Sequence, residues 1–203
     1  MMTNTWKIDP AHTDVGFSAT HMMVTTVRGK FDVVEGELTL DEANPLSANG
    51  EIRVATGSLS TGFDARDQHL RSADFFDAAA HPWIVARLTK VEPRGDDFRV
   101  TADVTIRDVT RPVTFDTEFN GIVPGMRGGR HAGFHLTAKV NREEWGLNWN
   151  VALEAGSWLV GREIRLDIDV AADEVAVPEV VAHEVGVADE VGVADETPAR
   201  AAA

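Results

Sequence analysis

Apolar and polar residues alternate with a period of two over most of this 203-residue sequence. A β-strand points successive side chains to opposite faces, so the pattern gives each strand one apolar and one polar face. Such strands are typical of antiparallel sheets, because parallel sheets are covered by helices on both faces. The chain is therefore predicted to be all-β. The clearest strands are expected at 98–106, 113–119 (with Val113, Phe115 and Phe119 on one face), 132–140 and 164–170.

Shorter runs with the same pattern occupy the first half of the chain. Strands are expected at 6–8, 15–19, about 52–59 and 84–88, while 21–26 is ambiguous. The segment 31–40 changes phase after Val33. A bulge at Val33–Val34 would keep Phe31, Val33 and the later apolar residues of this strand on one face.

One stretch, residues 63–83, breaks the alternation. A short helix is predicted there, because Asp64 is a favourable N-cap, Asp67 would sit at the third helical position, and residues 65–71 contain no β-branched side chain. Ser72 offers a cap for one further helical turn that ends at Phe76.

The length of this stretch indicates that it does more than connect two strands. Antiparallel neighbours need only about two to five linking residues, whereas this connection carries Phe63, Leu70, Phe75 and Phe76. Long connections in compact domains are usually functional. We therefore expect a short helical lid at about 64–76 over one end of the sheet.

About eight alternating strands must bury their apolar faces, and two architectures do so. One is a two-sheet sandwich with a filled core, and the other is a closed barrel around an apolar cavity. Periodicity alone does not separate them. Several runs reach about ten residues and exceed the usual strand length, which favours an extended antiparallel barrel.

Composition excludes several classes of function. The formal net charge of −14 argues against a nucleic-acid partner, which requires a clustered basic surface, and against attachment to anionic lipid headgroups. The chain has no cysteine, so disulfides, thiolate zinc sites and thiol nucleophiles are excluded.

The sequence also lacks a recognisable targeting or membrane segment. Its first residues, MMTNTWKIDPAH, have neither a basic region nor an apolar run, and no segment reaches the length of a membrane span. We therefore expect a cytoplasmic protein with no stable membrane insertion.

The composition changes abruptly near residue 171. Residues 172–203 contain no aromatic side chain, hold eight acidic residues against one basic residue, and repeat VGVADE at 185–190 and 191–196. Such a segment cannot bury enough apolar surface to fold alone. We expect a barrel domain at 1–171 and a flexible acidic tail at 172–203, although the tail's alternate valines could add to a sheet edge.

The histidines do not predict a metal site. His131 and His135 would lie about 13 Å apart on a strand, too far to share a zinc ion with bonds near 2 Å. The remaining candidates, His12, His21, His69 and His81, lie in or near turns and the lid, where surface or capping roles are the commoner ones.

Catalytic motifs are also weak. No G-x-S-x-G motif is present, although a serine hydrolase of that class would need one. The densest group of charged residues lies in the expected lid, where a salt-bridge and capping network that docks the lid to the barrel rim is favoured over acid–base catalysis. Its members are Arg66, Asp67, Arg71, Asp74 and Asp77.

Several motifs resemble those of one family. They are TWKIDPAHTDVGFSATHM from Thr5, RDQHLRSADFF at 66–76, TRPV at 110–113 and NREEWGLN from Asn141. The chain from about Thr5 to Ala171 is similar to the YceI-like family of lipid-binding, lipocalin-like proteins. This resemblance implies an extended barrel of about eight strands whose apolar cavity holds a polyisoprenoid chain or an amphiphile such as a quinone.

The leading hypothesis is therefore a noncatalytic protein that binds, transports or sequesters such a ligand. It requires no cofactor, has a small apolar or amphiphilic molecule as its partner, and leaves a homodimer open. The alternatives are an enzyme that uses lid histidines and aspartates, and a structural protein with a filled core. The expected ligand-binding residues are Phe17, Ile52, Val54, Ala86, Ala102, Val104, Ile106, Phe115, Leu136 and Ala138, with Leu70, Phe75 and Phe76 from the lid.

Overall fold

The computed structural model describes residues 4–125, 128–153 and 157–175, and within them strands dominate. The first seven strands are β1 (Asn4–Ile8), β2 (Asp14–His21), β3 (Thr25–Phe31), β4 (Val34–Leu40), β5 (Asn49–Ala55), β6 (Leu59–Ser60) and β7 (Trp83–Arg94). The last four are β8 (Asp97–Ile106), β9 (Val109–Pro124), β10 (Arg130–Asn141) and β11 (Val160–Glu174). The helical elements are α1 (Asp64–Arg71) and three short 3-10 helices, η1 (Pro45–Ser47), η2 (Thr56–Ser58) and η3 (Arg142–Trp145).

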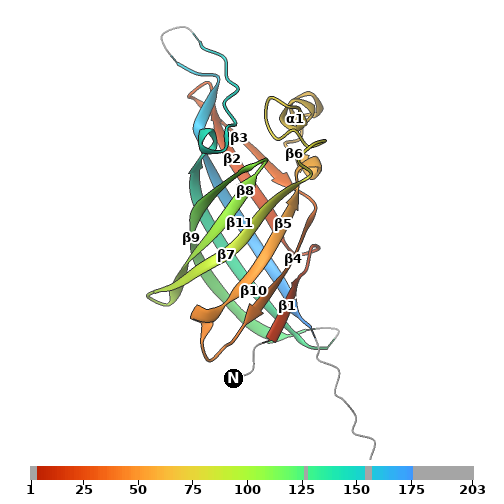
Figure 1. The fold of residues 1–203 in the computed structure, drawn as a ribbon, viewed down its shortest axis with the longest axis vertical. Coiled ribbons are helices and arrows are strands. Elements are labelled where there is room, and N and C mark those ends of the chain that lie inside the picture. The colour runs from red at the N-terminus through yellow and green to blue at the C-terminus, as the bar shows by residue number, and fades with distance from the viewer. Residues whose placement is uncertain (1–3, 126–127, 154–156, 176–203) are drawn as a thin grey trace, which may run out of the picture.

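The sheet closes on itself. Its antiparallel neighbours follow the order β1–β4–β5–β7–β8–β9–β10–β11, and β11 pairs again with β1. Among the described residues this ring contains eight strands, and closure leaves an interior that side chains or a ligand must fill. The predicted all-β antiparallel barrel is therefore confirmed, and the sandwich alternative is excluded (Figure 1).

The long strand β11 joins the two halves of the wall. It pairs with β1 through Ala172–Glu174 and with β2 through Val160–Asp169. β2 in turn pairs with β3, and β3 pairs with β6 beside the lid. Consequently β1 and β2 lie one after the other along β11, and β4 and β3 lie one after the other along β1 and β2. This division explains why the alternating runs in the first 40 residues are short.

The expected bulge at Val33–Val34 is wrong. The chain bends at Asp32 and Val33, where β3 ends and β4 begins, and Val33 is 48% exposed although Phe31 and Val34 are both buried. The bend is held by its neighbours: the backbone N–H of Val33 donates to the Ser58 hydroxyl at 3.0 Å. The bend turns the side chain of Val33 outward, so that Val33 does not join Phe31 and Val34 in the interior.

Phe119 lies on the apolar face of its strand, as predicted. It pairs with Phe134 of β10, which lines the cavity, and the two rings are tilted with centroids 5.4 Å apart. Phe119 is nevertheless 40% exposed. On β9, Gly121 pairs with Gly133, so Asn120 is an extra residue, and this bulge interrupts the alternation only after Phe119.

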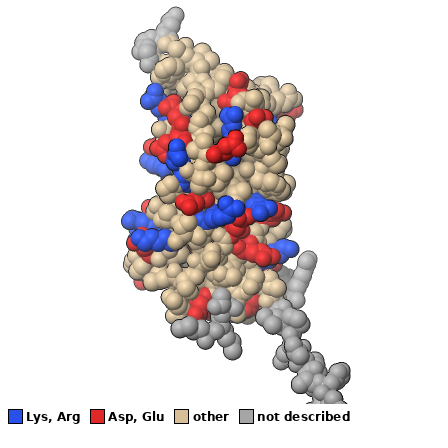
Figure 2. All heavy atoms as spheres, viewed as in Figure 1, with Lys and Arg blue, Asp and Glu red and all other residues tan. Residues whose placement is uncertain are grey.

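Polar residues cover the outside of the barrel. Lys, Arg, Asp and Glu side chains are interspersed over the middle of the face shown in Figure 2. Cross-strand pairs of opposite charge contribute to this surface, for example Arg87 with Glu51 at 2.7 Å and Arg94 with Asp116 at 2.6 Å. The outer face is thus the polar face that strict alternation requires.

The predicted helix is present, with corrected caps. The N-cap is Phe63 and not Asp64, which is the first helical residue, and no side chain caps this end. The helix ends at Arg71, and Ser72 is its C-cap. The expected further helical turn forms non-helical turns, although the N–H of Asp74 does point to the Ser72 hydroxyl at 3.4 Å.

The charged lid residues dock α1, but through hydrogen bonds to uncharged groups. Arg66 donates to the Thr61 hydroxyl at 2.7 Å and to the Thr61 carbonyl at 3.0 Å. Asp67 is buried and accepts from the N–H and the hydroxyl of Thr61. Arg71 donates to the carbonyl of Leu59. At Arg66, Asp67 and Arg71 the expected salt-bridge and capping network is therefore a network of hydrogen bonds, while Asp74 pairs with His69 at 2.8 Å.

The end of the described chain departs from the expected domain boundary. β11 continues past residue 171 to Glu174, and Ala172 is 0% exposed, so 172–174 belong to the barrel wall. Residues 176–203, which make up most of the predicted acidic tail, lie outside the described residues. Within the described ranges, every helix falls short of the length and hydrophobicity that a membrane-crossing helix requires.

Candidate functional site

The barrel encloses an apolar cavity of about 660 Å³. Its lining runs from Pro45 and Ala48, in the connection between β4 and β5, to Leu70 and Phe75 of the lid. Aliphatic and aromatic side chains from the inward faces of the wall strands supply most of that lining. The cavity therefore extends along the barrel, as a site for an elongated apolar molecule would.

All but one of the residues expected to bind ligand line this cavity. Those that do are Phe17, Ile52, Val54, Leu70, Phe75, Phe76, Ala86, Ala102, Val104, Ile106, Phe115 and Leu136. The exception is Ala138, which packs into the wall cluster that contains Val113, Phe115 and Trp145.

Aromatic contacts fix the lid over the barrel. Phe76 meets Phe31 of β3 edge to face, with ring centroids 5.7 Å apart. Phe75 lies 5.4 Å from the ring of Trp149, and His69 meets the same Trp149 edge to face at 4.5 Å. The lid is thus held on one side by the wall and on the other by the segment that follows η3.

Sequence reasoning missed the segment after β10. Trp145, Leu147 and Trp149 all line the cavity, and the Trp145 indole N–H donates to the carbonyl of Val104 at 3.0 Å. The sequence contains a signal for this segment, because Trp145, Leu147 and Trp149 continue the period-two alternation through an otherwise polar stretch. Trp6, 1% exposed, was placed on a strand but not assigned to the cavity that it lines.

A buried arginine holds this segment in place. Arg142 is 4% exposed and donates to the carbonyls of Leu147 and Gly161, the latter at 3.1 Å. Burial lowers the pKa of its guanidinium. Because these bonds join the η3 turn to β11, Arg142 positions Trp145 and Leu147 at the cavity wall.

Some lining residues reach the molecular surface. Phe63, at the start of the lid, lines the cavity and is 60% exposed. Asn49, at the other end of the lining, is also exposed. A ligand could therefore pass at the edge of the lid if α1 and the Trp149 segment separate.

The structure does not gather the lid histidines into one site. His69 Nε2 lies 2.8 Å from Asp74 Oδ2, while His81 Nδ1 lies 3.8 Å from Asp108 Oδ1. On the outer wall, His131 pairs with Asp173 and His135 with Asp169. Each of these four histidines therefore has a different carboxylate partner.

Comparison with known proteins identifies a family and a shared fold. The model of the YceI-like domain matches residues 6–172. A UPF0312 protein of Staphylococcus aureus strain USA300 is 34% identical over 183 residues, which is 88% of this chain and 100% of that protein.

Solved structures show the same architecture. The crystal structure of a YCEI protein from Campylobacter jejuni is 27% identical, with a TM-score of 0.65 over 83% of this chain and 96% of that chain. A polyisoprenoid binding domain from Saccharophagus degradans is 11% identical, with a TM-score of 0.54 over 86% of this chain and 100% of that chain. The latter likeness is one of fold alone.

Proposed function

This chain belongs to the YceI-like domain family, and on that premise we propose that it is a noncatalytic carrier that binds a polyisoprenoid, a quinone or a similar amphiphile inside its barrel. The observation that carries the proposal is the apolar cavity of about 660 Å³. Pockets for small ligands typically measure about 300–1,000 Å³ and bury most of the ligand. A filled core, as in a purely structural protein, would leave no such space.

The chemistry of the lining favours a long apolar chain over a compact polar substrate. Burial of apolar surface contributes about 25 cal/mol per Å², whereas a polar group placed in the same cavity loses its hydrogen bonds to water. Affinity should therefore increase with chain length until the cavity is full, and it should depend only weakly on the head group.

The lid contacts support a carrier more than an enzyme. His69 is engaged by Asp74 and packs edge-on against both Phe75 and Trp149. This is the environment of a side chain that docks a lid. In a carrier, the same contacts would set the rate of ligand release, because they must break when the lid opens.

One solved neighbour has a ligand class in its description. The Saccharophagus degradans domain is described as polyisoprenoid binding. Because the likeness to that domain extends to the fold only, the ligand class comes to this chain as part of the proposal. Its support here is the shape and lining of this chain's own cavity.

Titration of the full chain with linear prenols that differ by one isoprene unit tests the proposal. We expect each added unit to lower Kd by at least about tenfold until the cavity is full. A variant with Val123→Phe, which adds a ring at a 56% exposed position on the outside, should bind the series unchanged. Affinity that does not depend on chain length would contradict the proposal, as would turnover of a bound prenol.

A further inference from the structure

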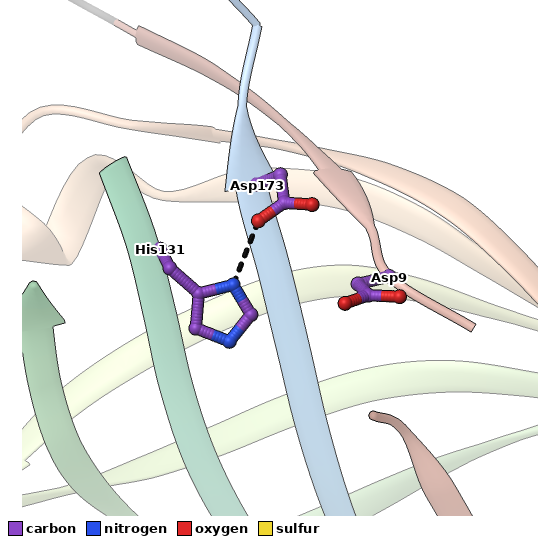
Figure 3. Close-up of side chains that lie close together, drawn as sticks. All are labelled: Asp9, His131 and Asp173. Carbon is purple, nitrogen blue, oxygen red and sulfur yellow. Dashed lines mark hydrogen bonds and ion pairs between the residues drawn. The ribbon is translucent and has the colours of Figure 1, made fainter. Parts of the chain in front are cut away.

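Two histidine–aspartate pairs meet on the outer wall, where β1, the start of β10 and the end of β11 run side by side; Figure 1 shows β1 in the part of the barrel away from α1. Asp9 and His12 come from the turn that follows β1, with Asp9 Oδ2 and His12 Nδ1 2.6 Å apart. His131 of β10 and Asp173 of β11 form the second pair, with Nδ1 and Oδ1 2.7 Å apart. Figure 3 shows the second pair joined by its hydrogen bond, with Asp9 across β11 from His131.

The register of three neighbouring strands brings these side chains together. Ala172 of β11 pairs with Ile8 of β1 on one side and with Ala132 of β10 on the other. These three residues are buried, at 0%, 4% and 1% exposure. Because side chains alternate along a strand, the residues next to them point outward. Asp9, Asp173 and His131 are those neighbours.

The donor atoms are close enough to share one ion. The ligand atoms of Asp9, His131 and Asp173 all lie within 4.8 Å of one another. The ring of His12 meets the ring of His131 edge to face, with centroids 6.2 Å apart. Tetrahedral zinc with bonds of about 2.0–2.1 Å holds its ligand atoms about 3.3 Å apart. Side-chain rotations that move each ligand atom by about 1 Å would therefore bring the atoms into this geometry.

We propose that Asp9, His12, His131 and Asp173 form a binding site for a divalent transition-metal ion, with Zn²⁺ as its representative. Two imidazoles and two carboxylates are a mixed nitrogen and oxygen set that suits zinc and its neighbours, whereas Mg²⁺ and Ca²⁺ prefer oxygen ligands alone. Two carboxylates also balance the charge of the ion.

The backbone holds one ligand in advance. The N–H of Asp9 donates to the carbonyl of Ala171 at 2.9 Å, and Asp9 Oδ1 accepts from the N–H of Ala11 at 2.9 Å. Only the other oxygen, Oδ2, remains to face His12. Such outer hydrogen bonds orient metal ligands and limit the entropy that binding costs.

A bound ion would fasten the closure of the barrel. Among the described residues, β1 pairs with three residues of β11, Ala172 to Glu174, and the site links the turn after β1 to both β10 and β11. Binding should therefore stabilise the folded chain at the point where the ring of strands closes, independently of any ligand in the cavity.

The wall provides a matched control. His135 and Asp169 form the same kind of pair on the same two strands, at 2.9 Å, but no second pair meets them among the described residues. A general attraction of surface His–Asp pairs for zinc would involve both pairs equally. A site formed by four side chains would involve only the first.

Calorimetric titration with ZnCl₂ tests the proposal on the chelator-treated full chain without a polyhistidine tag. We expect one zinc ion with Kd below about 10 μM, and a melting temperature about 5 °C higher at saturating zinc. His131→Gln and Asp173→Asn should each weaken binding at least about tenfold, and His135→Gln should leave it unchanged. No binding at millimolar zinc, or an equal loss in His135→Gln, would overturn the site.

A measurement on the unmodified chain guards against variants that do not fold. Zinc should shift the imidazole NMR resonances of His12 and His131 together, at one equivalent, while those of His135 stay in place. Shifts confined to other histidines would refute the assignment.

Discussion

The ring of Phe17 on β2 occupies the space that a side chain at Gly29 on β3 would fill. The two residues pair directly across the strands, and a Cβ added to Gly29 would lie 2.5 Å from Cζ and 2.9 Å from Cε1 of that ring. Phe17 also tilts against Phe31 at 5.5 Å and lines the cavity. The absence of a side chain at residue 29 therefore shapes the cavity wall.

Gly29→Ala should displace the Phe17 ring. Overpacking of this kind costs about 1–3 kcal/mol, so we expect a lower melting temperature and weaker binding of a long prenol. Gly57→Ala is the matched control, because a Cβ there would meet nothing within 4 Å. Equal melting temperatures for Gly29→Ala and Gly57→Ala would mean that Phe17 is free to move.

Trp145→Phe should destabilise the barrel. The substitution removes the indole N–H that donates to the Val104 carbonyl, a hydrogen bond worth about 0.5–1.5 kcal/mol, and it leaves a cavity because Trp145 is 2% exposed. Trp158→Phe, at a residue that is 43% exposed, should change the free energy of unfolding by less than about 0.5 kcal/mol. Urea denaturation measures the free energy of unfolding of both variants. An equally small loss in both would mean that the hydrogen bond of Trp145 does not stabilise the barrel.

Stability should depend on pH through His135. The hydrogen bond to Asp169 raises the pKa of this imidazole above its ordinary value. A raised folded-state pKa stabilises the protein fully below the unfolded value, about 6.5, and this contribution disappears as the pH rises through the raised value. The destabilisation by Asp169→Asn should therefore be largest near pH 6 and shrink toward pH 8.5. A destabilisation by Asp169→Asn that increases with pH would contradict this prediction.

Two truncations should separate the wall from the tail. Deletion of 172–203 removes Ala172, which is wholly buried, and Glu174, which pairs with Arg130 at 2.7 Å. We expect the melting temperature to fall by more than about 5 °C. Deletion of 176–203 should change it by less than about 2 °C, because the composition of that segment offers no core. Equal effects of the two deletions would reject this boundary.

The sequence predicted those features that depend on alternation alone. It placed most of the strands and their inward faces, and twelve of the thirteen residues that it assigned to ligand binding line the cavity, because the facing of a side chain follows directly from its position in a strand. It did not separate a barrel from a sandwich. That choice depends on the pairing of β1 with β11, which joins Trp6 to Glu174 across almost the whole described chain.

Features that arise from contacts between distant segments were missed or misplaced. Val33 leaves the interior because β3 and β4 bend where Ser58 bonds the chain. Asp67 docks the helix as expected, but it does so by accepting from Thr61 and not through a salt bridge. Asp9 and His131 come close because the residues next to them, Ile8 and Ala132, both pair with Ala172. None of these partners is a neighbour in the sequence.

The most direct test of the central claim is Leu136→Trp, with prenol affinity and the melting temperature of the ligand-free protein measured together. Leu136 lines the cavity on β10, so the indole should occupy ligand space. We predict weaker binding of the longest prenol with an unchanged melting temperature. Destabilisation of the ligand-free protein by about 1–3 kcal/mol, with binding intact, would contradict the account, because it would mean that this part of the barrel is a filled core.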